Sequence, residues 1–275
     1  MPIFLAISGY FLGFKKLKYR NEIHTFWKKQ IPKVYIPCII WSFPFFVTAI
    51  FCGGKSVLDQ FVMLLVCGYS IYYFVALIIQ YYLLLPLLQR YSRTIFFLSI
   101  AISLFSISII TYINTIRSCN LPLIVYAGPF TTWFCFYMMG VYISRNNFSI
   151  TMAKGILIVL FGLLLAYYLY TNYGGGVGIK LSSYVYSTGV IFLLFNPLIQ
   201  SLYKNNRITS VVEYCGKISF GIYLIHRYVI IFVSKFFSIS SWFCLWLVVI
   251  CLTGLAIFYS RKIFSKHVNK YLGFS

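Results

Sequence analysis

The chain has 275 residues, 61% of them hydrophobic and only 9% charged, with a mean hydropathy of +0.88. Soluble domains contain roughly 45–50% apolar and about 25% charged residues, so this composition excludes a soluble protein and indicates an integral membrane protein. The net charge is +20, and the only carboxylates are Glu22, Asp59 and Glu213. This scarcity argues against a carboxylate dyad or an acidic metal cluster, and we expect no metal site and no bound cofactor.

The basic residues form short runs between apolar stretches. A nucleic-acid-binding protein carries a basic face on a soluble fold, so we interpret the charge as membrane topology and expect no nucleic-acid partner. The eight cysteines contain no C-x-x-C pair and mostly lie inside apolar stretches. We interpret them as reduced residues that face lipid or protein, not as a disulfide framework.

The first apolar stretch runs from Met1 to Phe14 and is followed by the cations Lys15, Lys16 and Lys18. It is shorter than the about 20 residues that a bilayer crossing requires. A secretory signal has its charges first and a cleavage site afterwards, which is the opposite order. We therefore interpret 1–14 as a transmembrane helix without its beginning.

The basic segment that follows ends in FWKKQIPKVYIP, which places Lys28, Lys29 and Lys33 at the membrane surface just before an apolar helix. Such a cluster could hold the phosphates of a cytosolic donor. It could equally set the orientation of the chain and bind anionic lipid, at about 1 kcal/mol for each cation.

Eight further stretches are long enough to cross a bilayer, roughly 34–52, 71–89, 94–113, 128–144, 153–171, 183–203, 218–235 and 241–260. The sequence thus predicts an all-α integral membrane protein, a bundle of about nine transmembrane helices with the first one truncated, in a single domain over 1–275. Between Ser56 and Tyr69 lies VLDQFVMLLVCG, which is too short for a span. We expect an amphipathic helix on the outer face there, with a re-entrant segment as the alternative.

The span 218–235 contains the sharpest local feature. Lys217 marks its inner end and Lys235 its outer end, so His226 and Arg227 fall near the centre of the bilayer. An arginine at that depth costs about 2.5–3.5 kcal/mol and usually has a function. Tyr223 shares the helical face of both residues. The alternative for the histidine is a hydrogen-bonded core residue without a catalytic role.

With no carboxylate in any span, Arg227 needs another partner. The candidates are a backbone carbonyl, Gln80, Asn196, a tyrosine hydroxyl, an anionic ligand, or a group in a segment that precedes Met1.

Alternation of the spans places most of the cations on one side of the membrane, and the opposite loops hold only Lys55, Arg117, Lys180 and Lys235. The positive-inside rule then predicts a cytoplasmic C-terminus and a first helix that starts outside. That start again suggests that an earlier span is missing.

Four ordered blocks of the sequence resemble the acyltransferase 3 family, the multi-span membrane acyltransferases that O-acetylate bacterial surface polysaccharides and related glycans. The blocks are PIFLAISGYFL (2–12), FWKKQIPKVYIPCIIW (26–41), YYFVALIIQYYLLLPLL (72–88) and GKISFGIYLIH (216–226), and FCFYMMGVYISR (134–145) is similar to the family's mid-chain helix. Several positions depart from the family pattern. Gln30 and Lys33 occupy positions where the family usually has two arginines. Ile71 occupies the position of a family histidine, and Arg227 that of a family proline. The family's first span, with its histidine, would precede Met1.

The resemblance implies transfer of an acyl group, expected to be acetyl, from acetyl-CoA or another acyl-CoA to a hydroxyl of a cell-surface glycan or its lipid-linked precursor, at the bacterial plasma membrane. Lys29 and Lys33 are then candidates for donor binding, Tyr223 and Arg227 for acceptor binding or support, and His226 for the catalytic base. The alternatives are an export protein for polysaccharide of the same superfamily and an inactive truncated remnant.

Overall fold

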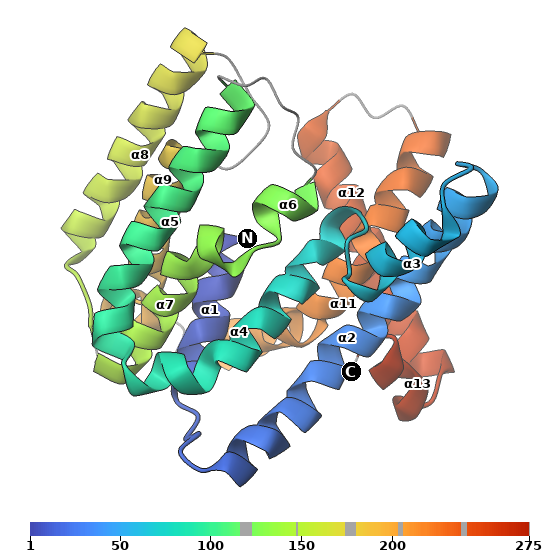
Figure 1. The fold of residues 1–275 in the computed structure, drawn as a ribbon, viewed down its shortest axis with the longest axis horizontal. Helices are drawn as coiled ribbons and strands as arrows, with labels where there is room; N and C mark the ends of the chain where they lie inside the picture. The colour runs from blue at the N-terminus through green and yellow to red at the C-terminus, as the bar shows by residue number, and fades with distance from the viewer. Residues whose placement is uncertain (116–122, 147, 174–179, 203–205, 238–240, 275) are drawn as a thin grey trace. The chain divides into compact units, whose positions relative to one another are not determined.

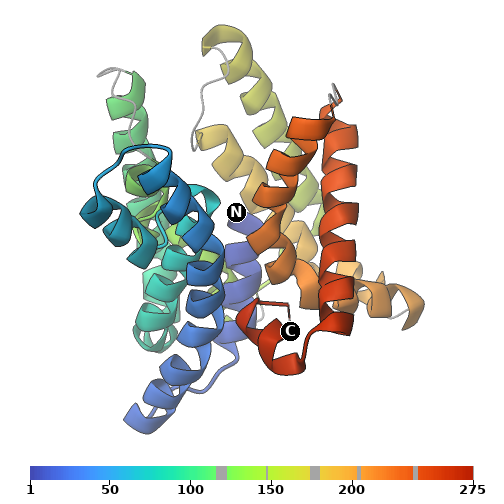
Figure 2. The same cartoon turned by 90° about the vertical axis from the view of Figure 1, so that its right-hand side faces the viewer.

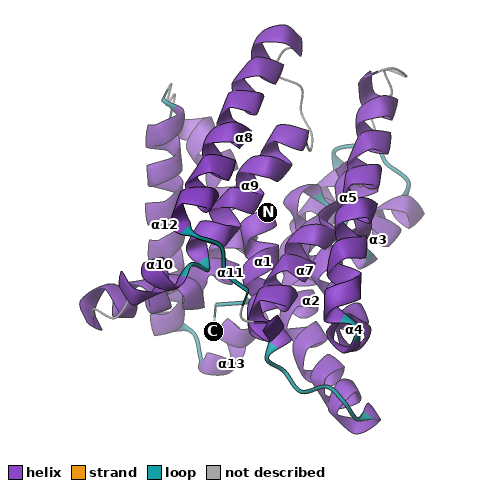
Figure 3. Ribbon diagram, turned by 90° about the vertical axis from the view of Figure 1, so that its left-hand side faces the viewer, coloured by secondary structure: helices purple, strands orange, loops and turns teal. Residues whose placement is uncertain are grey.

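The computed structural model describes residues 1–275 except 116–122, 147, 174–179, 203–205, 238–240 and 275. Within this part of the chain every regular element is a helix, and no strand occurs (Figures 1 and 3). The elements are α1 (Pro2–Gly13), α2 (Arg20–Phe51), α3 (Val57–Leu65), the 3-10 turn η1 (Ser70–Tyr72), α4 (Tyr73–Arg90), α5 (Ser92–Thr115), α6 (Leu123–Ala127), α7 (Phe130–Asn146), α8 (Met152–Tyr173), α9 (Leu181–Leu194), α10 (Pro197–Leu202), α11 (Asn206–Phe236), α12 (Trp242–Ile263) and α13 (Lys266–Tyr271).

Among the residues that the structure describes, seven helical segments are long and apolar enough to cross a membrane, and α1 and α9 are shorter apolar helices of 12 and 14 residues. The prediction of an all-α membrane protein is therefore confirmed. Arg117, which enters the orientation argument, lies outside the described residues.

The predicted span 183–203 is not one continuous helix, because α9 ends at Leu194. Pro197 lacks the backbone N–H that a continuing helix would use, and α10 begins there instead. The buried Asn196 stabilises the break. Its amide donates to the Ile150 carbonyl at 2.7 Å, and its side-chain oxygen accepts from the Leu198 N–H at 3.0 Å.

The chain divides into two compact units. Unit 1 comprises residues 1–26 and 80–204, and unit 2 comprises residues 27–79 and 205–275. The helix α4 contributes its first seven residues to unit 2 and the remainder to unit 1. The prediction of a single domain over 1–275 stays a prediction.

Unit 1 is built on close packing of α1 against α7, with α5 on α7 and α8 beside α9 (Figure 1). Gly9 and Gly13 on α1 are one helical turn apart, and Gly140 lies on α7. A Cβ atom on Gly140 would lie 1.9 Å from the Ala6 carbonyl oxygen, and one on Gly9 would lie 2.2 Å from the Tyr137 carbonyl oxygen. These glycines let the two backbones approach closely, as small residues do between transmembrane helices.

The C-terminal end of α1 is held by Arg145, in the last turn of α7. The Arg145 Nε donates to the Gly13 carbonyl at 3.1 Å, and its Nη2 donates to the Lys15 carbonyl at 3.4 Å. The last carbonyls of a helix have no partner within the helix. Arg145 therefore acts as a cap for α1 supplied by another helix.

In unit 2 the chain reverses direction after α2. Gly54 has a φ of +57°, and α3 then runs back along α2, so that the Tyr35 hydroxyl donates to the Leu65 carbonyl at 2.9 Å. Tyr35 precedes Phe51, the last residue of α2, by sixteen positions, which is about 24 Å along a helix. The segment 52–72, named here the re-entrant hairpin, thus folds back along α2, and its position relative to the membrane stays a prediction.

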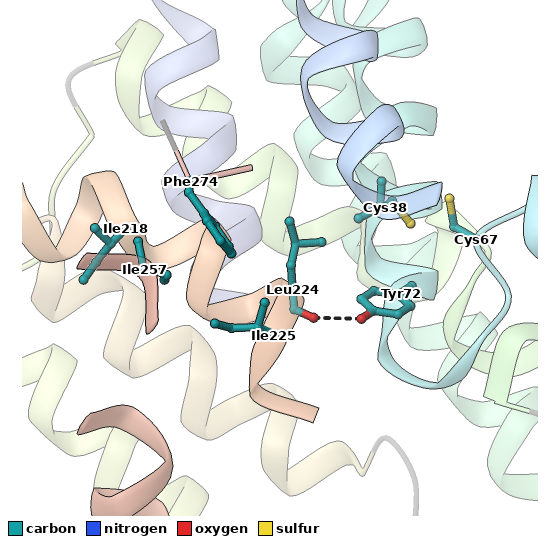
Figure 4. Close-up of a cluster of buried hydrophobic side chains, with 9 residues drawn as sticks. Cys38, Cys67, Tyr72, Ile218, Leu224, Ile225, Ile257 and Phe274 are labelled. Atoms are coloured by element: carbon teal, nitrogen blue, oxygen red, sulfur yellow. Dashed lines mark hydrogen bonds between the residues drawn. The ribbon is translucent and has the colours of Figure 1, made fainter. Parts of the chain in front are cut away.

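The core of unit 2 forms where α2, the re-entrant hairpin, α11 and the C-terminal tail meet. Its buried members are Cys38, Cys67, Tyr72, Val75, Ile218, Leu224, Ile225, Ile257 and Phe274 (Figure 4). The helices α11 and α12 pack side by side (Figure 2). The tail is fixed by the Trp41 indole, which donates to the Leu272 carbonyl at 3.0 Å, and by Arg261, which donates to the Phe274 carbonyl.

Candidate functional site

All five candidate site residues lie in unit 2, on two helices. Lys29 and Lys33 belong to α2, and Tyr223, His226 and Arg227 belong to α11. Among the described residues no group of three or more His, Cys, Asp and Glu side chains could hold a metal ion.

The geometry around His226 determines which ring nitrogen carries the proton. The Nδ1 atom lies 2.7 Å from the Tyr223 carbonyl oxygen and 3.2 Å from the Ile222 carbonyl oxygen, both on the preceding turn of α11. A carbonyl oxygen only accepts hydrogen bonds, so Nδ1 must be the donor. In the neutral imidazole the lone pair is then on Nε2, which has no partner among the described residues. The half-buried His226 ring is therefore in the tautomer that a general base requires, with Nε2 able to accept a proton.

Tyr223 connects α11 to the turn before α4. Its hydroxyl donates to the Ile71 carbonyl at 2.5 Å, and the Tyr72 hydroxyl donates in the other direction, to the Leu224 carbonyl at 2.7 Å (Figure 4). The two bonds join η1 and α11 in both directions, in the helical turn that precedes His226. With its hydroxyl engaged and its carbonyl bound to His226, Tyr223 has the contacts of a supporting residue.

Replacement of Tyr223 by phenylalanine is expected to lower the free energy of unfolding by about 1–2 kcal/mol, because the Ile71 carbonyl loses its donor. Any catalytic rate that depends on His226 should fall as well, because one of the two hydrogen bonds between η1 and α11 is lost. Thermal unfolding in detergent and an activity assay measure the two effects. Tyr214→Phe on the exposed part of α11 is the matched control, and equal behaviour of the two variants would contradict this role.

Arg227 is exposed and makes no hydrogen bond or ion pair with any residue that the structure describes. The carboxylate of its own helix, Glu213, is fourteen positions away, about 21 Å along the axis. The two amides considered as partners are engaged within unit 1, where Gln80 bonds Gly128 and Phe130 and Asn196 bonds Ile150. Of the candidate partners, the two that lie outside the described chain remain, namely an anionic ligand and a group in a preceding segment.

The two lysines follow one face of α2. Lys29 and Lys33 are exposed and four residues apart, and Pro37 and Trp41 continue the same face at the same spacing. Trp41 lies beside the part of α11 that carries His226. The Trp41 carbonyl accepts from the hydroxyl of Tyr228, two residues after His226, and the Trp41 and Tyr228 ring centroids lie 5.6 Å apart. Lys33 precedes Trp41 by about 12 Å along the helix and Lys29 by about 18 Å.

The sequence did not single out three residues that build this site. Tyr72, Trp41 and Tyr228 each bond to a main-chain carbonyl on a distant part of the chain. The sequence contains 25 tyrosines, so residue type gave no signal for Tyr72 or Tyr228. The blocks 26–41 and 72–88 include Trp41 and Tyr72 but did not distinguish them from their neighbours.

The fold and this site define a multi-pass membrane protein with a histidine held in one tautomer within a long apolar helix. The family model described as "Acyltransferase domain", that of the acyltransferase 3 family, matches residues 1–260. The chain therefore belongs to the acyltransferase 3 family, and it is a membrane enzyme that transfers acyl groups. No curated protein and no solved structure matches the chain.

Proposed function

We propose that this enzyme transfers an acyl group from acetyl-CoA or another acyl-CoA to a hydroxyl of a cell-surface glycan or its lipid-linked precursor. The acyl group we propose is acetyl. It would act in the bacterial plasma membrane with its C-terminus in the cytoplasm. The observation that carries the proposal is the hydrogen bond from His226 Nδ1 to the Tyr223 carbonyl, because it leaves Nε2 free to accept a proton.

In this proposal His226 Nε2 takes the proton of the acceptor hydroxyl while the hydroxyl oxygen attacks the thioester carbonyl. The tetrahedral intermediate then collapses, the carbon–sulfur bond breaks, and the histidine returns the proton to the coenzyme A sulfur. Arg227, next in the chain, offers guanidinium N–H donors to an oxygen-rich acceptor. Tyr223 supports the histidine through its carbonyl and η1 through its hydroxyl.

Lys29 and Lys33 bind the phosphates of the donor. Their place on α2, about 12 and 18 Å before the level of Trp41, agrees with a donor that keeps its phosphates at the cytoplasmic surface and extends its thioester arm toward His226. The cations would attract the phosphates before the arm is inserted.

The proposal is tested by measuring glycan-bound acetyl in cells that carry the gene, in cells from which it is deleted, and in deleted cells that regain it. Deletion should remove acetyl from one glycan, and the restored gene should return it. Unchanged acetylation in all three strains would overturn the proposal, and loss of surface glycan without a change in its acetyl content would point to export.

Removal of both donor-binding cations, in Lys29→Ala/Lys33→Ala, should raise the KM for the acyl-CoA about tenfold and leave kcat nearly unchanged, since each exposed charge pair is worth up to about 1 kcal/mol. Added salt should raise the KM of the wild type more than that of the variant. Lys28→Ala is the control, because Lys28 lies about 100° around the helix from Lys29. An unchanged KM in the double variant would assign these lysines to lipid contact.

A further inference from the structure

Three helix ends of unit 1 meet around the C-terminal end of α1 (Figure 1). The Gln89 amide, in the last turn of α4, donates to the Leu12 carbonyl at 2.7 Å. Arg145, in the last turn of α7, donates to the carbonyls of Gly13 and Lys15 at 3.1 and 3.4 Å. These hydrogen bonds hold the ends of α1, α4 and α7 together, although the segments are far apart in the sequence.

The beginning of α5 lies at the same end of unit 1. The Phe96 ring, near the start of α5, stacks on the Tyr142 ring, one turn before the end of α7, with centroids 4.5 Å apart. The four segments therefore bring exposed cations to one place. We name these cations the basic junction, and they are Lys15, Lys16, Arg90 and Arg93.

The basic junction has no counter-charge in the part of the chain that the structure describes. Its four side chains make no hydrogen bond or ion pair with a described residue. The Arg90 guanidinium lies 5.4 Å from the centroid of the Tyr91 ring, a contact that leaves its N–H groups available. The carboxylate of unit 1, Glu22, accepts instead from the backbone N–H groups of Lys18 and Tyr19 at 2.9 and 3.1 Å. An anion is therefore the partner that these charges lack.

The surroundings of the basic junction are apolar and aromatic. Phe14, Tyr19 and Tyr91 are exposed beside the cations, and exposed aromatic rings are enriched where a membrane meets water. Leu87 precedes Arg90 by three positions on α4, and Phe97 follows Arg93 by four positions on α5. Both are exposed, and this spacing places each on the helical face of its arginine. The surface thus combines cations with apolar side chains that continue along the helices.

We propose that the basic junction binds the headgroup of an anionic phospholipid. The arginines would donate paired N–H groups to the phosphate oxygens, and the lysines would add positive charge. The acyl chains would extend along α4 and α5, over the exposed Leu87 and Phe97. Basic pockets between transmembrane helices are known to bind lipid phosphates in this way.

This site is distinct from the proposed donor site, because the basic junction belongs to unit 1, whereas Lys29 and Lys33 belong to unit 2. It also goes beyond the rule that places cations on one side of the membrane. That rule counts cations in separate loops, whereas the basic junction is formed by the contacts that hold α1, α4, α5 and α7 together. A bound lipid would neutralise the charges around the end of α1 and so stabilise unit 1.

The test adds phosphatidylglycerol to the full-length protein in detergent and measures its Tm and its bound lipid by native mass spectrometry. Phosphatidylglycerol should bind and raise the Tm, and phosphatidylcholine at the same concentration should not. Arg90→Gln/Arg93→Gln should weaken the binding of phosphatidylglycerol about tenfold. The control is Lys262→Gln/Lys266→Gln, which removes the same charge from exposed positions in unit 2 and should bind the lipid as the wild type does.

Four outcomes would overturn the proposal. The first is an equal effect of phosphatidylglycerol and phosphatidylcholine. The second is an equal loss of binding in the two double variants, which would reflect net charge alone. The third is an equal rise in Tm with inorganic phosphate at the same concentration, which would show that the ligand need not be a lipid. The fourth needs no variant: binding of phosphatidylglycerol to the wild type should weaken as salt is added, and binding that salt leaves unchanged would contradict a site of exposed cations.

Discussion

His226→Asn is expected to lower the rate of acyl transfer by about 100- to 10,000-fold, the usual contribution of a general base. Asparagine places an amide N–H near the position of Nδ1, so the bond to the Tyr223 carbonyl can persist while the basic Nε2 is lost. The variant should therefore unfold near the temperature of the wild type. Purified protein, labelled acetyl-CoA and acceptor glycan provide the measurement.

The matched control is His267→Asn, since His267 is an exposed histidine on α13 and should not affect the rate. Two results would contradict the role of His226 as a base. One is a His226→Asn variant that keeps more than half of the activity, and the other is a loss of activity that follows a loss of folded protein in the same preparation.

Gly140→Ala is expected to destabilise the fold by about 3 kcal/mol or more, the upper part of the range for overpacking. The new Cβ would lie 1.9 Å from the Ala6 carbonyl oxygen and 2.7 Å from the Tyr10 nitrogen, both backbone atoms of α1. Backbone atoms cannot turn aside as a side chain can, so α1 and α7 must separate. Thermal unfolding and the yield of folded protein in detergent measure the effect.

Gly216→Ala and Gly254→Ala are the controls, because an added Cβ at either position meets no atom within 4 Å. Both glycines lie inside helices, where alanine is favoured by about 1 kcal/mol, so these variants should be as stable as the wild type or slightly more stable. A Gly140→Ala protein with unchanged stability would contradict the close packing of α1 on α7.

The helices could be predicted from the sequence because a span depends on local composition. Apolar stretches such as 94–113 and 153–171 correspond to α5 and α8. The prediction failed at 183–203, where the apolar character continues but Pro197 and the Asn196 bonds end the helix. Composition alone does not predict such a break. Pro197 is a local signal for it, because a proline disfavours the helical conformation at the residue before it.

The place of His226 and Arg227 within a long apolar helix could be predicted from the sequence, and their depth in the bilayer stays a prediction. The tautomer of His226 and the engagement of Tyr223 by Ile71 could not be predicted. Each depends on contacts that form only when α2, the hairpin and α11 pack together. The close approach at Gly140 is likewise a property of two helices, and no single stretch of sequence specifies it.

The most direct test of the central claim is the transfer of labelled acetyl from acetyl-CoA to glycan by the purified protein in liposomes, with wild type and His226→Asn assayed side by side. The account predicts label in the glycan with the wild-type protein and a rate at least 100-fold lower with the variant. Equal rates for the two proteins, or no transfer by a folded wild-type protein, would contradict it.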